Sequence, residues 1–141
     1  MNRPKFRVWD IEEQKWYKPT YKAYMKQLHD IHIDLDGSLL IRTIDDSGKN
    51  VTIHESMFEG RYELLQSTGL LDKNGTEIFE GHIVKDTDGY VGYIAFLKQE
   101  MGYVVVYKTY DKRLGHRYRL DDGRLEILGN IYQDKHLLGE D

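Results

Sequence analysis

The sequence predicts a mainly β protein with minor α, in which a β-rich N-terminal half is followed by a small β-barrel. Three observations predict this class. The 141 residues include only two alanines, the best helix formers, against eleven isoleucines, seven valines and seven threonines. Branched and aromatic side chains suit a pleated, half-buried surface, and aromatic residues make up 12% of the chain. Thirteen glycines and only two prolines supply turns without interrupting strand ladders.

Two strands and one helix are expected first along the chain. Alternating apolar residues predict a strand over 5–10, and the strand returns as a hairpin at Trp16 and Tyr17. Thr20 is a suitable N-cap, so a short helix is predicted over 20–29. The apolar residues that fit its helical spacing are Tyr21, Tyr24, Met25 and Leu28.

A second hairpin is centred on Asp36 and Gly37, a pair that favours a two-residue type I′ turn. Its strands are expected over 31–35 and 39–44, and a third strand follows at 51–53. Two polar segments, 45–50 and 55–61, are the best places for a boundary between halves. We therefore divide the chain into a region 1–60 and a region 61–141.

The second region alternates short apolar segments with turn signals. Its strand candidates are 62–66, 77–79, 82–85, 90–97, 101–109, 117–120 and 125–131. The turn signals between them are Asn74-Gly75, Glu80-Gly81, Asp88-Gly89, Gly115 and Asp122-Gly123. Strands at this spacing predict a sandwich or small barrel. A helical turn is expected over 134–138 at its end.

Composition narrows the classes of function. Hydrophobic residues make up 40% and charged residues 31%, as in ordinary soluble proteins. The chain has no cysteine, which excludes disulfides, thiolate zinc sites and cysteine nucleophiles. The net charge is −4, and both signs are mixed along the chain, so no overall attraction to nucleic acid or membrane is expected. Apolar runs are too short to span a bilayer, and no secretory signal is visible.

Three segments together carry a family resemblance: 5–10 (KFRVWD), 66–84 (QSTGLLDKNGTEIFEGHIV) and 128–132 (LGNIY). In this order and spacing they resemble the YopX family of proteins encoded by bacteriophages and prophages. The resemblance implies a small, largely β protein in the cytoplasm of the bacterial host. It also implies that region 61–141 is similar to an SH3-like barrel. One position departs from the family, which usually has aspartate where this chain has His82.

The resemblance implies no reaction, ligand or catalytic residue, and the motifs of known chemistry are missing. There is no nucleophile elbow and no phosphate-binding loop. His54 and Glu55 begin like a zinc-binding helix, but Phe58 stands where the second histidine is needed. We therefore expect a protein that is not an enzyme and has no metal site or cofactor. An enzyme would need a cleft that holds His54, Glu55 or His82 beside a second carboxylate.

The most informative local feature is the segment 107–119, which carries a local charge of +4 and three tyrosines. Its basic residues are candidates for phosphate contacts, and its tyrosines for stacking on unpaired bases. The candidates are Lys108, Lys112, Arg113, Arg117 and Arg119, with Tyr107, Tyr110 and Tyr118. The alternative is a polar hairpin whose arginines pair with Asp111, Asp121 or Asp122 while the tyrosines cover the barrel.

A third interpretation is assembly, either as a homo-oligomer or on a host protein. Trp9 and Trp16 suit interface anchors and core residues equally well. The sequence thus predicts a phage or prophage accessory protein of unassigned biochemical role that acts by binding. Nucleic acid and protein are the competing partners, and no membrane partner is expected.

Overall fold

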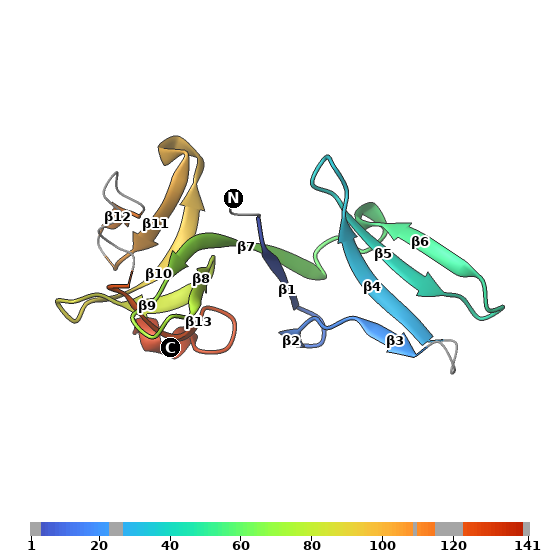
Figure 1. Ribbon diagram of the computed structural model, residues 1–141, viewed down its shortest axis with the longest axis horizontal. Coiled ribbons are helices and arrows are strands. Elements are labelled where there is room, and N and C mark those ends of the chain that lie inside the picture. The colour runs from blue at the N-terminus through green and yellow to red at the C-terminus, as the bar shows by residue number, and fades with distance from the viewer. Residues whose placement is uncertain (1–3, 23–26, 109, 115–122, 140–141) are drawn as a thin grey trace. The chain divides into compact units, whose positions relative to one another are not determined.

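The computed structural model describes residues 4–22, 27–108, 110–114 and 123–139, and it is mainly β as predicted (Figure 1). Within these residues the chain forms β-strands and short 3₁₀ helices. None of the helices among them is long and apolar enough to cross a membrane.

The chain forms two compact units. The N-terminal unit is Val8–Glu63, and the C-terminal unit combines Met1–Arg7 with Leu64–Asp141. Strands β1 (Phe6–Asp10) and β7 (Tyr62–Leu71) each run from one unit into the other. They are neighbours in a sheet of order β2-β1-β7-β8.

The N-terminal unit is built from antiparallel hairpins (Figure 1). The predicted first hairpin is present, since Trp9 of β1 pairs with Trp16 of β2. The next four strands form a sheet of order β3-β4-β5-β6. The 3₁₀ helix η2 (Glu55–Met57) follows β6 along the chain. The remaining elements are β2 (Lys15–Trp16), β3 (Thr20–Lys22), β4 (Gln27–Ile33), β5 (Leu39–Ile44) and β6 (Asn50–His54).

The helix expected over 20–29 is wrong, because strands β3 and β4 occupy this part of the chain. They pair antiparallel, with Thr20 opposite His29 and Lys22 opposite Gln27. A helix of about ten residues pays the full cost of nucleation and gains few hydrogen bonds. Pairing with β5 extends β4 through Ile31 and Ile33, and this long-range ladder outweighs the local helical spacing.

The C-terminal unit is a curled half-barrel sheet of order β12-β11-β10-β9-β13 (Figure 1). Its elements are β8 (Glu77–Phe79), β9 (His82–Lys85), β10 (Val91–Leu97), η3 (Lys98–Glu100), β11 (Gly102–Val106), β12 (Asp111–Arg113), β13 (Glu126–Asn130) and η4 (Lys135–Leu138). The 3₁₀ helix η4 confirms the helical turn expected over 134–138. The strand expected over 117–120 lies outside the described residues.

The core of this unit lies inside the curl of the sheet. Ile78, Val84 and Ile94 are at most 1% exposed and form its centre. The other buried members are Leu70, Val105, Tyr107 and Leu125. Side chains from several non-adjacent strands therefore meet in one cluster, which a curved sheet allows and a flat one does not.

Four hairpins use one turn, in which an aspartate is followed three residues later by a glycine. The turns span 34–38, 45–49, 72–76 and 86–90. In each, the aspartate N–H donates to the carbonyl four residues on, and the glycine N–H donates to the aspartate carbonyl. Each glycine has φ between 84° and 89°, which disfavours any side chain. The two-residue turn expected at Asp36 and Gly37 is therefore wrong, because the loop has three residues and needs positive φ at Gly37 alone.

The side chain of the first aspartate also closes three of these turns. Oδ1 of Asp45, Asp72 and Asp86 accepts the N–H groups two and four residues on, each at 2.9 Å. Asp72 is only 3% exposed, and its Oδ2 accepts the N–H of Ile127 in β13 at 3.2 Å. Burial alone would raise the pKa of Asp72, but these backbone hydrogen bonds outweigh it and hold the pKa below its ordinary value.

We predict that Asp72→Ala lowers the free energy of unfolding by about 2–4 kcal/mol, because it removes the acceptor of three N–H groups around a buried carboxylate. Urea unfolding at pH 7 measures this change. Asp45→Ala is the matched control, since it removes two of the same bonds from an exposed turn, where water replaces them. Equal losses in the two variants would contradict the role of Asp72 in joining the hairpin to β13.

Candidate binding site on the C-terminal unit

The residues of the basic, tyrosine-rich segment that the structure describes lie at one edge of the half-barrel. Tyr107, Lys108 and Tyr110 follow β11, and Lys112 and Arg113 belong to the edge strand β12. Strand β12 pairs with β11, which places the backbone of Lys112 opposite Val105. Three further candidates lie outside the described residues: Arg117, Tyr118 and Arg119.

Tyr107 is a structural residue. Its side chain belongs to the buried core, and its hydroxyl donates to Oδ2 of Asp86 at 2.8 Å. Burial raises the pKa of Asp86, but the hydrogen bond from Tyr107 and the bonds of the 86–90 turn outweigh it, so that the pKa is lowered. Tyr107 is therefore anchored by the core that surrounds its ring and by the hydrogen bond of its hydroxyl.

Tyr110 is exposed and stacks on this anchored ring. The two ring centroids are 4.7 Å apart at an interplanar angle of 24°, and 54% of Tyr110 is exposed. The backbone holds the pair together, since the N–H of Tyr107 donates to the carbonyl of Tyr110 at 2.7 Å. The pair thus presents an aromatic surface whose position is fixed before any ligand binds.

A cavity of about 280 Å³ reaches Tyr107, the anchored member of this pair. Its lining residues are Val91, Tyr93, Val106, Tyr107, Lys108, Leu138 and Gly139. Lys108 brings the one charged side chain of this lining, and it has no acidic partner within 4 Å among the residues that the structure describes. The cavity therefore combines apolar walls, tyrosine rings and one cation.

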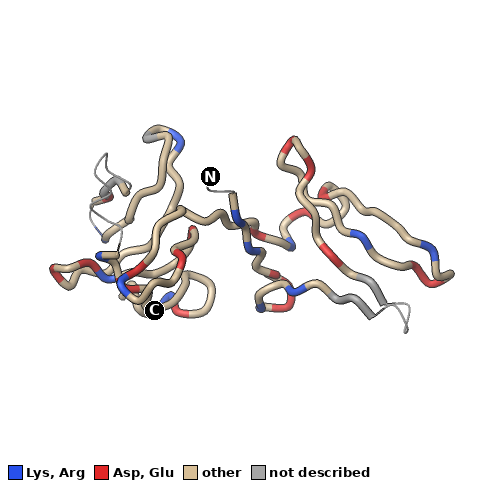
Figure 2. Tube along the Cα trace, viewed as in Figure 1, with Lys and Arg blue, Asp and Glu red and all other residues tan. Residues whose placement is uncertain are grey.

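Elsewhere on the unit, acidic and basic residues are both spread along the chain (Figure 2). Lys73 and Lys85 both pair with Glu126, and Lys5 pairs with Glu77 at 3.2 Å. These ion pairs neutralise much of the charge around the sheet. Lys108, next to the tyrosine pair, has no such ion pair among the described residues.

A second cavity, of about 290 Å³, lies in the N-terminal unit and holds the residues that an enzyme would need. It is lined by Leu39, His54, Glu55, Ser56, Phe58, Glu59, Gly60 and Tyr62. His54 caps η2, because its Nδ1 accepts the N–H of Ser56 at 3.1 Å and bonds the Ser56 hydroxyl at 3.0 Å. Glu55 accepts the N–H of Leu39 at 3.0 Å. Through these hydrogen bonds, both side chains stabilise the turn that follows β6.

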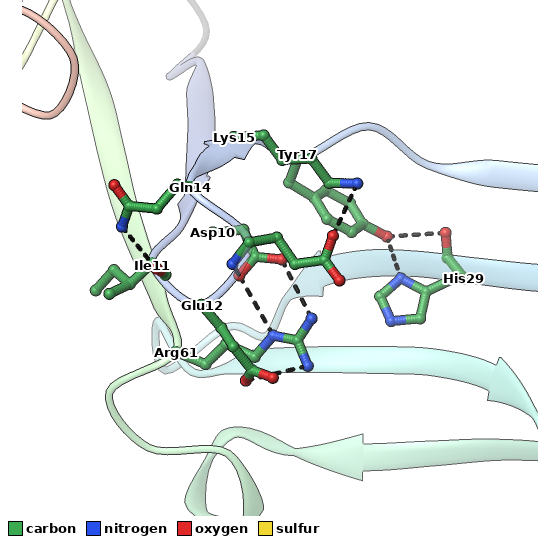
Figure 3. Close-up of polar contacts among 9 residues, drawn as sticks. Asp10, Ile11, Glu12, Gln14, Lys15, Tyr17, His29 and Arg61 are labelled. Atoms are coloured by element: carbon green, nitrogen blue, oxygen red, sulfur yellow. Dashed lines mark hydrogen bonds and ion pairs between the residues drawn. The ribbon is translucent and has the colours of Figure 1, made fainter.

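A polar cluster organises the start of the N-terminal unit (Figure 3). Asp10 is 3% exposed and accepts hydrogen bonds from Nε and Nη2 of Arg61 at 3.4 and 3.2 Å. Burial raises the pKa of Asp10, but Arg61 and the backbone N–H groups of Glu12 and Glu13 together outweigh burial, so the pKa is lowered. Glu12 also pairs with Arg61, at 3.6 Å. Since 51 residues separate Asp10 from Arg61, no local pattern in the sequence signals this pair.

The histidines and tryptophans of this unit also have structural partners. The Tyr17 hydroxyl donates to the carbonyl of His29 at 2.8 Å and lies 2.9 Å from its Nδ1 (Figure 3). His32 pairs with buried Asp30 at 2.9 Å. Within the described parts of the chain, no three metal-ligating side chains come together. Trp9 is 1% exposed and meets Trp16 edge to face at 4.9 Å, so Trp9 is a core residue.

His82 closes the bend of the central motif. It is 7% exposed, and its Nδ1 accepts the N–H of Phe79 at 2.9 Å across Glu80 and Gly81. Burial, followed by the nearby Arg7 charge, lowers the pKa of His82 to about 4. An aspartate carboxylate can accept the same N–H, so the departure from the usual family residue preserves the acceptor of this bend.

We predict that His82 makes folding pH-dependent between pH 6.5 and about 4. In this range the unfolded histidine takes up a proton while the folded one stays neutral, so the free energy of unfolding falls as the pH falls. Above pH 6.5 both forms are neutral and the effect is absent. His82→Asn keeps an acceptor for Phe79 and should reduce the slope by about 1 kcal/mol per pH unit. Urea unfolding at several pH values measures it.

The variant His82→Ala distinguishes the stability that comes from the hydrogen bond to Phe79 from the pH dependence that comes from protonation of His82. It should lose stability at every pH, because the Phe79 N–H is left without its acceptor, and it should show the same reduced slope. If the free energy of unfolding of both variants depends on pH as it does in the wild type, His82 is not the source of the pH dependence.

Comparisons with a family model and with solved structures lead to the same family. The family model for the YopX protein matches residues 5–139. The fold resembles the crystal structure of protein EF1440 from Enterococcus faecalis, with 25% identity, a TM-score of 0.54 and coverage of 96% of this chain and 98% of that one. It also resembles protein yopX from Bacillus subtilis, with 19% identity, a TM-score of 0.54 and coverage of 98% and 99%. No curated protein matches. The chain therefore belongs to the YopX family.

Proposed function

We propose that this protein is a non-enzymatic accessory protein of a phage or prophage, acts in the host cytoplasm, and binds single-stranded nucleic acid through its C-terminal unit. The observation that carries the proposal is the exposed Tyr110 ring, stacked on the anchored Tyr107 and next to Lys108 and a cavity. The curled half-barrel also supports the expectation of an SH3-like barrel in this unit.

The tyrosine pair suits an unpaired base. Every base has a π-face, and stacking on an aromatic side chain contributes about 1–3 kcal/mol per base without regard to sequence. Because Tyr107 is already held by Asp86 and by the core, Tyr110 loses little freedom when a base stacks on it. A base inserted in the adjacent cavity would meet apolar walls and the Tyr93 ring.

The cations supply the attraction to phosphate. Lys108 lies at the cavity, and Lys112 and Arg113 follow within five residues along the edge strand. Arg117 and Arg119 continue the series in the sequence. Since the whole chain carries a net charge of −4, this attraction is local, and we expect modest affinity that falls with salt.

We predict that a fluorescein-labelled oligothymidylate binds the wild type at low salt. The variant Lys108→Ala/Lys112→Ala/Arg113→Ala should bind more weakly, and the slope of its log association constant against log salt concentration should be shallower by about two to three. Fluorescence anisotropy at several salt concentrations measures both. The matched control Lys15→Ala/Lys18→Ala/Lys22→Ala removes the same charge from the N-terminal unit and should keep the wild-type slope.

Tyr110→Ala tests stacking apart from charge. It should weaken binding about 5- to 100-fold without changing the salt slope. Tyr90→Ala, which removes another exposed tyrosine from a turn of the same unit, should have no effect. The proposal fails if the wild type does not bind at low salt, or if the two tyrosine variants bind equally well.

A further inference from the structure

We propose that strand β6 (Asn50–His54) is a self-pairing edge, through which a second copy of this chain extends the sheet of the N-terminal unit. Strand β6 is the last strand of the order β3-β4-β5-β6, and β5 is its one neighbour in that sheet. This surface is separate from the site proposed for nucleic acid and does not depend on it.

The turn before β6 determines which backbone groups face outward. The N–H of Asp45 donates to the carbonyl of Lys49, so this pair is hydrogen-bonded. Bonded and non-bonded pairs alternate in an antiparallel ladder, so Val51 and Ile53 bond to β5. The N–H and C=O groups of Asn50, Thr52 and His54 therefore point away from β5.

The turn at the other end of β5 leads to the same assignment. The N–H of Asp34 donates to the carbonyl of Ser38, which makes Leu40 and Arg42 bond to β4. Ile41 and Thr43 are then left to bond β6, where they lie opposite Ile53 and Val51. Two independent turns therefore lead to the same conclusion, that the backbone groups of Asn50, Thr52 and His54 face outward.

Strand β6 lacks the protection that the other described edges have. Strand β12 consists of three charged residues, and β13 has an irregular register between Ile127 and Gly129. Strand β3 follows Pro19 and has only three residues, and β2 and β8 have two and three. Strand β6 has five residues, a regular register with β5, and neither proline nor lysine nor a carboxylate. Natural edges are normally blocked by such features.

The sequence of β6 is complementary to itself about Thr52. A two-fold axis at this residue pairs Thr52 with its own copy and Val51 with the second copy's Ile53. Both of these β-branched residues lie on the sheet face of buried Ile41, so the pairing joins apolar side chains across the copies. Asn50 lies opposite the second copy's His54 on the polar face.

The charges that flank β6 favour the same register. Lys49 precedes the strand and Glu55 begins η2 directly after it, so the two-fold axis at Thr52 brings the end that carries Lys49 in one copy near the end that carries Glu55 in the other. Opposite charges therefore come near each other at both ends of the paired strands. In this arrangement the three outward-facing residues of each strand exchange both backbone hydrogen bonds with the second copy. The interface is small, so we expect a weak dimer that forms only at high protein concentration.

The test is sedimentation velocity of the full chain over a wide range of protein concentration, from the micromolar range upward. The wild type should shift from monomer to dimer, and Thr52→Lys should stay monomeric because two lysines meet on the axis. Thr87→Lys adds the same charge to an exposed turn of the C-terminal unit and should dimerise like the wild type. A wild type that stays monomeric, or a Thr52→Lys variant that dimerises, overturns the proposal.

A second variant keeps the test decisive if Thr52→Lys folds poorly. The chain has no cysteine, so Thr52→Cys introduces a single thiol on the axis. A short bismaleimide should cross-link Thr52→Cys to a covalent dimer in high yield, and Thr87→Cys should give little. Equal yields from the two variants would show that β6 does not face its copy.

Discussion

Each of the four aspartate–glycine turns ends in one backbone hydrogen bond, from the aspartate N–H to the carbonyl four residues on, and the fold depends on these bonds. Side chains alternate between the two faces of a strand, so a slip by one residue would exchange the buried and exposed sets. The glycine at φ of 84° to 89° and the aspartate carboxylate make the three-residue loop the preferred one. The register of four hairpins follows from them, and so does the outward-facing set of groups on β6.

The same turn is used in different environments, and the environment decides what each aspartate does. Asp45 lies in an exposed turn and caps only its own loop. Asp72 is buried and accepts a third N–H from β13, which joins the first hairpin of the C-terminal unit to its last strand. Asp86 uses one oxygen for its turn and the other for the Tyr107 hydroxyl. Asp86 therefore links the 86–90 turn to Tyr107, and in this way the turn helps to position the aromatic pair of the proposed binding site.

Burial also decides which polar groups are ionised. Asp10, Asp72 and Asp86 stay charged because hydrogen bonds or Arg61 more than offset the loss of water. The ring of His82 is buried near Arg7, and the charge of Asp72 does not offset these two effects, so His82 is neutral above its pKa of about 4. The two kinds of group act in different pH ranges. The carboxylates stabilise the fold until the pH falls below their ordinary pKa, whereas His82 lowers stability as soon as the pH falls below 6.5.

Local patterns of residues are enough to predict the β class, the first hairpin, the closing helical turn and the family, because branched residues, glycines and the 66–84 motif are local signals. Tertiary structure decided the rest. Two strands form in place of the helix expected over 20–29, since a ladder with β5 outweighs about three helical turns. The tertiary structure buried Tyr107 and Trp9, left Tyr110 exposed, and paired Asp10 with Arg61. These outcomes depend on contacts between residues far apart in the chain, whose free energy no short window of sequence contains.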